Sequence, residues 1–336
     1  MGKDLSFLYE NCELCPRRCH VDRTKGQAGY CRETSSLMAA RASLHEWEEP
    51  CISGTCGSGT VFFSGCNMGC VFCQNYEIAH AKVQKQITSE HLSEIFLRLQ
   101  DRNASNINLV TPTHFMPTIV NALERARDNG LIIPVVYNTS GYETADKLKY
   151  LDGLIDIYLP DFKYFSSDIS KKYSNATDYS KVCLGAIKEM VRQTGNPVFF
   201  APKVQPSNIS CKEKTMTADE YNDYVTGELI DDYCGPLMKK GTIVRHMMLP
   251  GNLEDSKKIV FLLHEHFQDN IFISLMNQYT PMPYAKEYKE LTKKVGSAEY
   301  EALVDYAIEI GVNNAFIQGD ETALDSFIPE FDFRGL

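Results

Sequence analysis

The chain has 336 residues, of which 43% are hydrophobic and 23% are charged, and its formal net charge is −10. This length allows one large α/β domain with an appendage. No apolar run is long enough to span a bilayer, and the acidic balance argues against nucleic acid as a partner. The first residues lack the pattern of an export signal, so we expect a cytoplasmic protein whose twelve cysteines favour metal sites over disulfides.

The first group of cysteines lies near the amino terminus. Cys12, Cys15 and Cys19 follow one another closely, and Cys31 comes twelve residues later in a glycine-containing stretch. Four thiols suit a closed zinc site, and a tight trio with a remote fourth thiol also suits an iron–sulfur cluster. We predict that residues 1–57 form a cysteine-rich segment with a second metal site, Fe–S or Zn, with Fe–S preferred. Reduced thiols without a metal are the alternative.

An acidic stretch follows this group. His45 to Pro50 reads His-Glu-Trp-Glu-Glu-Pro and contains the single tryptophan of the chain. We interpret its carboxylates as part of a solvated turn. Cys51 and Cys56 come next, and the sequence assigns them no role beyond that of simple thiols.

The second group of cysteines is the most informative stretch of the chain. Cys66, Cys70 and Cys73 fall within eight residues, directly after 59–64, where β-branched and aromatic residues predict a buried strand. The spacing i, i+4, i+7 would also place core cysteines on one helix face. Intervening glycines and an asparagine favour a loop instead. Thiolates in such a loop select iron–sulfur clusters, zinc or cuprous copper. Three thiolates would leave one iron of a cubane open to a substrate or cofactor.

Strands and helices are predicted to alternate through residues 58–336. Expected strands cover 106–110, 132–137, 155–159, 197–200, 242–249, 271–276 and 315–317. Expected helices begin after Thr88, begin at Pro117, cover 145–151 and 181–192, pass through 259–263 and follow a cap at Ser297. Repeated βα units predict a parallel sheet. We therefore expect an α/β fold, a partial (β/α)6-type TIM-like barrel, with residues 202–240 inserted near the barrel mouth.

Polar residues follow the predicted strands. In barrels of this kind the chemistry gathers at the carboxyl ends of the strands. These ends carry Thr111, Thr113, His114, Asn138, Thr139, Ser140, Asp161, Lys163, Arg245, His246, Asn277 and Gln278. We expect this set to surround bound ligands, with His114 and His246 interpreted as structural histidines before catalysts.

The cysteine loop also resembles a known signature. Cys-x3-Cys-x-aromatic-Cys, with Phe72 in the aromatic position, is similar to the motif of the radical S-adenosylmethionine (SAM) enzymes. The resemblance implies that Cys66, Cys70 and Cys73 hold a 4Fe-4S cluster, that SAM chelates the fourth iron, and that Phe72 packs near the adenine. It also implies reductive cleavage of SAM to a 5′-deoxyadenosyl radical, which abstracts hydrogen from a substrate.

Nearly the whole chain is similar to the pyruvate formate-lyase activating enzymes, and more closely to a branch with a cysteine-rich amino-terminal segment. The similarity lies in residues 12–19, 45–50, 59–78, 137–142, 161–164, 245–251 and 275–279. With the strand-end argument it implies SAM contacts from Phe72, Thr111, Thr113, Asn138, Thr139, Ser140, Asp161, Lys163 and Gln278. It also implies catalytic roles for Lys163 and Arg245.

The sequence departs from these activating enzymes at two places. The Gly-Gly-Glu segment that holds the methionyl amino group is absent, and 110–114 occupies its place. Asn138 replaces an acid at the start of a loop that lies beside SAM and a monovalent cation in those enzymes. A monovalent cation here is therefore a weaker expectation than SAM.

Three functions remain open from the sequence. The first is activation of a glycyl residue in a partner enzyme. The second is radical SAM chemistry on a small molecule or a peptide. The third is a non-catalytic iron–sulfur or zinc protein. For the first two we expect an electron donor such as flavodoxin or ferredoxin as a partner, and neither nucleic acid nor a membrane.

Overall fold

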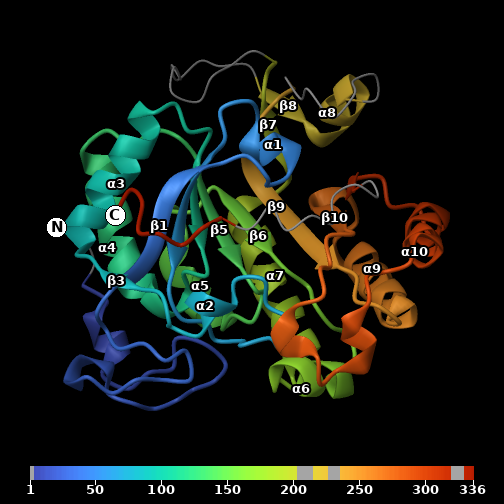
Figure 1. Ribbon diagram of the computed structural model, residues 1–336. Helices are drawn as coiled ribbons and strands as arrows, with labels where there is room; N and C mark the ends of the chain where they lie inside the picture. Colours follow the sequence, from blue (N-terminus) through green and yellow to red (C-terminus); the bar gives the residue numbers. More distant parts are fainter. Residues whose placement is uncertain (1–3, 203–214, 226–234, 319–328) are drawn as a thin grey trace.

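The computed structural model describes residues 4–202, 215–225, 235–318 and 329–336. Seven parallel strands run through these residues as neighbours in one sheet (Figure 1). In spatial order they are β2 (Ser58–Phe63), β4 (Ile107–Val110), β5 (Val135–Thr139), β6 (Ile157–Pro160), β9 (Met238–Met247), β10 (Phe272–Met276) and β11 (Ala315–Ile317). Most of their side chains are buried, as expected for a parallel sheet that is covered on both faces.

Helices connect the parallel strands and cover the outside of the sheet (Figure 1). They are α3 (Ser89–Asp101), α4 (Met116–Asp128), α5 (Ala145–Leu148), α6 (Ser167–Ser174), α7 (Tyr179–Thr194), α9 (Leu253–Phe267) and α10 (Ser297–Glu309). Thr88 caps α3 as predicted, because its side chain accepts a hydrogen bond from the His91 amide. The alternation of strands and helices confirms the predicted α/β class.

Three features of the fold were not predicted from the sequence. First, β1 (Met38–His45), whose small residues gave no strand signal, pairs antiparallel with β2 and with the short β3 (Lys85–Gln86). Second, α10 is preceded by Gly296 rather than by a capping Ser297. Third, the carboxyl-terminal residues 329–336 run along β1, where Phe333 and Arg334 pair with Ala40 and Ala42.

The stretch 202–240 is placed differently from the prediction in its described residues. β7 (Val198–Phe200) pairs antiparallel with the first residues of β9, before β9 reaches β6 at Gly241. β8 (Thr215–Thr217) and α8 (Ala218–Val225) follow β7 on the same side, next to α1 (Pro50–Ser53) (Figure 1). These elements therefore close the amino-terminal end of the sheet, opposite the mouth. Cys211, Cys234 and the rest of the stretch lie outside the described residues.

The segment from residue 4 to residue 36, which we call the amino-terminal lobe, is made of loops and two 3-10 turns, η1 (Ser6–Tyr9) and η2 (Arg23–Lys25). It forms the dark blue part of Figure 1. Leu5, Leu8 and Leu14 join the main core. Arg23 is fully buried and donates Nη1 to the carbonyl of His114 at 2.5 Å. The lobe is therefore packed onto the barrel and is not a separate unit.

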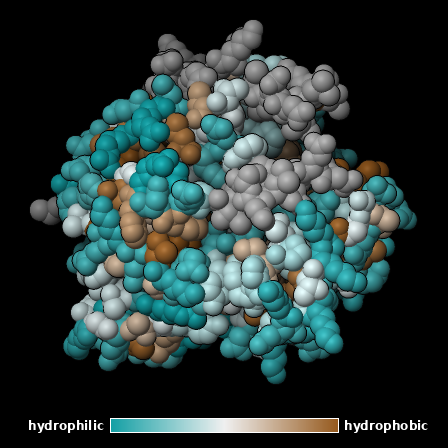
Figure 2. Space-filling model, viewed as in Figure 1, coloured by the Kyte–Doolittle hydropathy of each residue, from teal (hydrophilic) through white to brown (hydrophobic). Residues whose placement is uncertain are grey.

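The surface of this face is mostly hydrophilic, with hydrophobic residues in small groups (Figure 2). In the described ranges, no helix combines the length and the apolarity needed to cross a bilayer.

Candidate functional site

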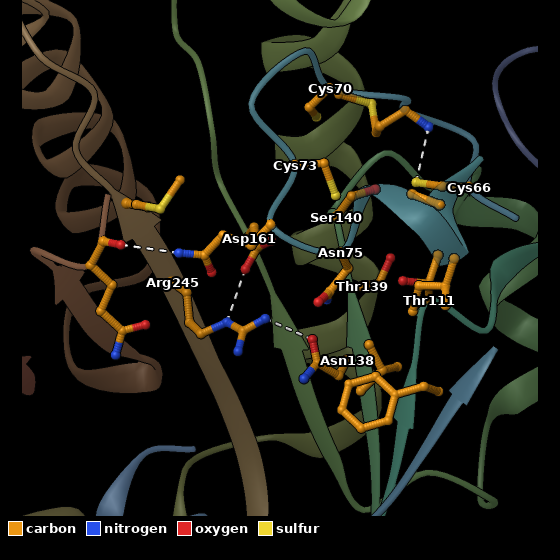
Figure 3. A pocket seen from close by; sticks show the side chains of 18 of the residues that line it. Cys66, Cys70, Cys73, Asn75, Thr111, Asn138, Thr139, Ser140, Asp161 and Arg245 are labelled. Carbon is orange, nitrogen blue, oxygen red and sulfur yellow. Dashed lines mark hydrogen bonds and ion pairs between the residues drawn. The ribbon is translucent and has the colours of Figure 1, made fainter. Parts of the chain in front are cut away.

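A cavity lies at the carboxyl ends of the parallel strands (Figure 3). Its walls come from the loop after β2, from the ends of β4, β5 and β6, and from β9 and β10. The predicted site residues that line it are Cys66, Cys70, Phe72, Cys73, Thr111, Asn138, Thr139, Ser140, Asp161, Lys163, Arg245 and Gln278. Residues that are up to 212 positions apart in the sequence therefore line one cavity at the ends of the strands.

Cys66, Cys70 and Cys73, which we call the loop cysteines, lie at one end of this cavity (Figure 3). Gly65 turns the chain out of β2 with φ of +81°. The Met68 amide donates to Cys66 Sγ at 3.3 Å, and Ser174 Oγ donates to Cys70 Sγ at 3.0 Å. Hydrogen bonds from N–H and O–H groups to sulfur stabilise thiolates, so the surroundings of these sulfurs fit ligands of a metal centre.

The loop cysteines, of which Cys70 is buried and Cys66 and Cys73 are partly buried, lie among groups that do not favour free thiolates. Burial and the charge of Cys70 raise the pKa of Cys66 and of Cys73 above the ordinary thiol value. The single cation that lowers both pKa values is Lys163. Metal coordination deprotonates a thiol outright, so a bound cluster would supply the charge that these thiolates need.

Phe72 lies between two of these cysteines and is only 4% exposed. Its ring packs edge-on against Tyr164, Tyr173 and Tyr279, with ring centroids 6.2–6.3 Å apart. Edge-to-face packing of this kind stabilises a fixed ring position. Phe72 therefore anchors the loop in the core, and it also lines the cavity.

Arg245 crosses the side of the cavity formed by β5, β6 and β9 (Figure 3). Its guanidinium donates Nε to Asp161 Oδ1 at 2.9 Å, Nη1 to Glu48 Oε2 at 3.0 Å and Nη2 to Asn138 Oδ1 at 2.6 Å. Although burial opposes its charge, Asp161 and Glu48 raise the pKa of Arg245 above its ordinary value. Arg245 is thus a fixed cation.

Lys163 is the second cation of the cavity. Its Nζ donates to Asp161 Oδ2 at 2.6 Å. Burial opposes its charge, but Asp161 and Cys70 raise the pKa of Lys163 above its ordinary value. Both oxygens of Asp161 therefore accept from cationic side chains.

Thr111 stands at the end of β4 with φ of +60°, which is rare for a β-branched residue. Its amide donates to the carbonyl of Asn138 at 2.9 Å, which fixes this conformation next to β5. Strained residues of this kind cluster at functional sites. The strained residue itself lines the cavity.

Four of the predicted strand-end residues do not line the cavity, namely Thr113, His114, His246 and Asn277. Thr113 Oγ1 donates to the buried carboxylate of Glu143, which burial shifts to a pKa of about 7. His114 Nε2 bonds the carbonyl of Ser64 at 2.6 Å, and His246 Nδ1 bonds that of Phe162 at 2.8 Å. The geometry makes both histidines structural and places Thr113 behind the wall of the cavity.

The sequence interpretation missed the role of the acidic stretch before Cys51. Glu46 is exposed, but the other two carboxylates are not solvated: Glu49 is 8% exposed, and the Glu48 side chain is buried beside Arg245. Glu48 Oε1 also accepts from Asn108 Nδ2 at 2.9 Å and from Asn138 Nδ2 at 3.2 Å. The sequence observation that could have revealed this role was the resemblance of residues 45–50 to the activating enzymes. A solvated turn would not account for that resemblance.

The amino-terminal cysteines Cys12, Cys15, Cys19 and Cys31, which we call the lobe cysteines, are free thiols like Cys51 and Cys183. All but Cys19 are buried. Burial raises the pKa of Cys15 to about 12 and that of Cys31 to about 11. Within the described ranges, no three His, Cys, Asp or Glu side chains are grouped closely enough to hold a single metal ion.

Residues 60–200 match the family model of the Radical SAM superfamily. The matched range includes the three loop cysteines and the strand ends from β4 to β6. This match supports a radical SAM domain, with a 4Fe-4S cluster and SAM as the cofactors that the family implies.

Among whole proteins, an uncharacterized protein of Methanocaldococcus jannaschii is 25% identical over 309 residues, which are 89% of this chain and 75% of that protein. Two solved structures share lower identity. SuiB of Streptococcus suis, bound to the precursor peptide SuiA, is 13% identical with a TM-score of 0.47, and the match covers 76% of this chain. This chain spans about half, 47%, of the SuiB chain. A radical SAM methyltransferase of Sphaerobacter thermophilus is 12% identical with a TM-score of 0.41, over 79% and 69% of the two chains.

Proposed function

We propose that this protein is a radical SAM enzyme in which the loop cysteines hold a 4Fe-4S cluster and SAM occupies the cavity beside it. The observation that carries the proposal is the position of three thiols, one buried and two partly buried, at one end of a polar cavity, where two of the sulfurs accept hydrogen bonds. Their surroundings fit thiolate ligands, and they lie inside the family match.

When bound and reduced, the cluster supplies the electron that splits SAM into methionine and a 5′-deoxyadenosyl radical, which abstracts hydrogen from a substrate. The chain itself binds and orients. Lys163 stands as a permanent cation near the loop cysteines and offsets their negative charge. Asn138, Thr139 and Ser140 present amide and hydroxyl groups along the cavity wall and are proposed contacts of SAM.

The substrate side of the cavity faces the acidic stretch. Trp47 lines the cavity and is 55% exposed, so it forms part of the rim. An exposed aromatic at a rim suits contact with a polypeptide. This supports hydrogen abstraction from a glycyl residue of a partner enzyme or from a peptide. A small-molecule substrate is the second candidate, because Arg245, Lys163 and Gln278 offer polar groups inside the cavity.

The reaction class is tested by SAM cleavage. The protein is reconstituted anaerobically with iron and sulfide, reduced with dithionite and incubated with SAM, and 5′-deoxyadenosine is measured by chromatography. We expect the product from the wild-type protein and from a Cys56→Ser control, which removes a thiol outside the cavity. We expect none from Cys70→Ala. Iron-loaded wild-type protein that forms no 5′-deoxyadenosine would refute the proposal, and the cluster would then be non-catalytic.

The substrate class needs a separate measurement. Deuterium from a labelled substrate appears in 5′-deoxyadenosine when that substrate is the hydrogen donor. Candidate glycyl-radical enzymes, peptides and small molecules can be compared in this way. A Trp47→Ala variant should weaken the reaction of a polypeptide substrate more than that of a small molecule. Equal effects on both would exclude a rim contact as the basis of selection.

A further inference from the structure

The acidic stretch, residues 45–50, enters the cavity from the end opposite to the loop cysteines. β1 runs antiparallel to β2, so His45 at the end of β1 pairs with Ser58 at the start of β2. The loop cysteines come after the last residue of β2. His45, Glu48 and Glu49 line the same cavity as those cysteines. The cavity therefore extends along β2, from the loop cysteines to the acidic stretch.

The charged side chains on the wall of the cavity do not balance. In the described part of the chain, three carboxylates but only two Lys or Arg side chains line the cavity. Both oxygens of Asp161 accept from Lys163 and Arg245. Glu48 Oε2 accepts from Arg245 at 3.0 Å, and Glu48 Oε1 accepts from two asparagine amides. Glu49 is the carboxylate that remains beyond these pairs.

Glu49 is buried and lacks a full set of hydrogen bonds. The residue is 8% exposed, and its Oε2 atom has no hydrogen-bond partner among the described residues. In the same part of the chain, the buried Oδ1 of Asn108 beside Glu48 also lacks a partner. So does the buried hydroxyl of Ser274, which faces Glu49. Since buried polar atoms are normally hydrogen-bonded, these three atoms are available to a ligand in the cavity.

The chemistry of these atoms selects a particular kind of ligand group. A carboxylate oxygen and an amide oxygen only accept hydrogen bonds, whereas ammonium and guanidinium groups only donate them. His45 adds no competing charge at this end, because burial lowers its pKa to about 4 and leaves the ring neutral near pH 7. A ligand carboxylate or phosphate would instead be repelled by Glu48 and Glu49. The surroundings therefore favour a positively charged nitrogen group with several N–H donors.

We propose that Glu49, with Asn108 and Ser274, forms a subsite that binds an ammonium or guanidinium group of the substrate. We call it the amine subsite. It holds the charged nitrogen without forming or breaking a bond to it, and it thereby orients the rest of the substrate in the cavity. Trp47, on the exposed rim two residues before Glu49, is placed to contact the apolar stem that carries the charged group. This inference rests on the proposed function and names the substrate class.

Binding is tested with small probes and the fluorescence of Trp47, the single tryptophan of the chain. The anaerobically reconstituted protein is titrated with n-butylammonium, n-butylguanidinium or neutral n-pentanol. At least one cation should change the fluorescence saturably and bind about tenfold or more tightly than the alcohol. Tighter binding of butylammonium would indicate an amine as the substrate group, and tighter binding of butylguanidinium a guanidine. Equal affinity for the alcohol, or saturation of the same signal by potassium chloride, would overturn the proposal.

Variants show whether the cation binds at Glu49. Glu49→Gln keeps the shape of the side chain but removes its charge, and it should weaken binding of the preferred cation by about tenfold or more. The matched control is Glu46→Gln, which makes the same change at an exposed carboxylate of the same stretch and should leave the affinity unchanged. Equal affinities in the two variants would overturn the proposal. If Glu49→Gln does not fold, Ser274→Ala supplies the test: affinity should fall by about threefold, and an unchanged affinity would exclude the subsite.

The titrations need neither SAM nor a reductant, so their result is separate from the test of SAM cleavage. Wild-type protein that forms 5′-deoxyadenosine but does not prefer the cations would overturn the amine subsite alone. Iron-loaded protein that forms no 5′-deoxyadenosine would refute the proposed function, whatever it binds. In the deuterium-transfer assay, a labelled peptide or small molecule with a charged nitrogen should donate hydrogen better than its neutral analogue, such as a peptide with norleucine in place of lysine. Equal transfer from both would contradict selection by charge.

Discussion

Replacing Arg245 by methionine tests the buried charge network at the side of the cavity. The guanidinium is shared by Asp161, Glu48 and Asn138, and the side chains of Arg245, Glu48 and Asp161 are only 13%, 8% and 21% exposed. Methionine keeps much of the apolar stem but removes the charge and all three hydrogen bonds. Two carboxylates would then remain buried without this cation.

The expected cost follows from that burial. Removing one partner of a buried ion pair destabilises a protein by about 3–5 kcal/mol, because the remaining charge is left uncompensated. For a chain of this size, that loss corresponds to a decrease in Tm of about 4–7 °C. Adding Glu48→Gln to Arg245→Met should recover part of the loss, since it removes one of the stranded charges.

The assay is urea unfolding followed by circular dichroism at pH 7 and pH 5, with exposed Arg102→Met as the control. The stranded carboxylates have raised pKa values in the folded variant, so proton uptake stabilises the fold as the pH falls. The deficit of Arg245→Met should therefore shrink at pH 5, while the control stays within about 0.5 kcal/mol of wild type. A deficit below about 1 kcal/mol, or no recovery with Glu48→Gln, would refute the network.

Two further predictions concern the contact of the lobe with the barrel. Gly65→Ala should destabilise the protein by about 1–3 kcal/mol and speed hydrogen exchange in the lobe, because a β-carbon there would meet Glu33 Cγ at 2.5 Å and the Cys31 carbonyl. The control is Gly130→Ala, at a position with φ of +98° and open space, which should cost only about 1 kcal/mol. Equal rates of lobe hydrogen exchange in the two variants would contradict the contact. Burial lowers the pKa of His114 to about 3, below its ordinary 6.5, so the stability that it contributes is present above pH 6.5 and is lost as the pH falls. Relative to His114→Gln, the wild-type protein should lose about 2 kcal/mol between pH 7 and pH 5 in urea unfolding, and a constant difference would show that the histidine is accessible to water.

Much of the sheet was predictable because the residue types within each strand differ from those that follow it. In β2, Val61, Phe62 and Phe63 are buried on both faces, and the run stops at a glycine. In β4, β5 and β10, a run of mostly buried residues is likewise followed by a polar residue. Since parallel strands end at one edge, the polar residues that follow them had to meet there, and most of the predicted set lines the cavity.

The acidic stretch could not be interpreted from local pattern. Glu48 pairs with Arg245 across 197 positions and with Asn108 across 60. Adjacent carboxylates in a short polar stretch look the same in a solvated turn and in a buried network, because the difference lies in partners that only the tertiary fold supplies. The contact between Gly65 and Cys31 has the same character, since neither residue type predicts the other's position.

The central claim is that the loop cysteines leave one iron of their cluster open to SAM. Electron paramagnetic resonance of the anaerobically reconstituted and reduced protein tests it directly. Added SAM should change the g-values of the reduced 4Fe-4S signal, as expected when a ligand binds iron, and Cys70→Ala should remove the signal. A 4Fe-4S signal that SAM leaves unchanged would contradict the account.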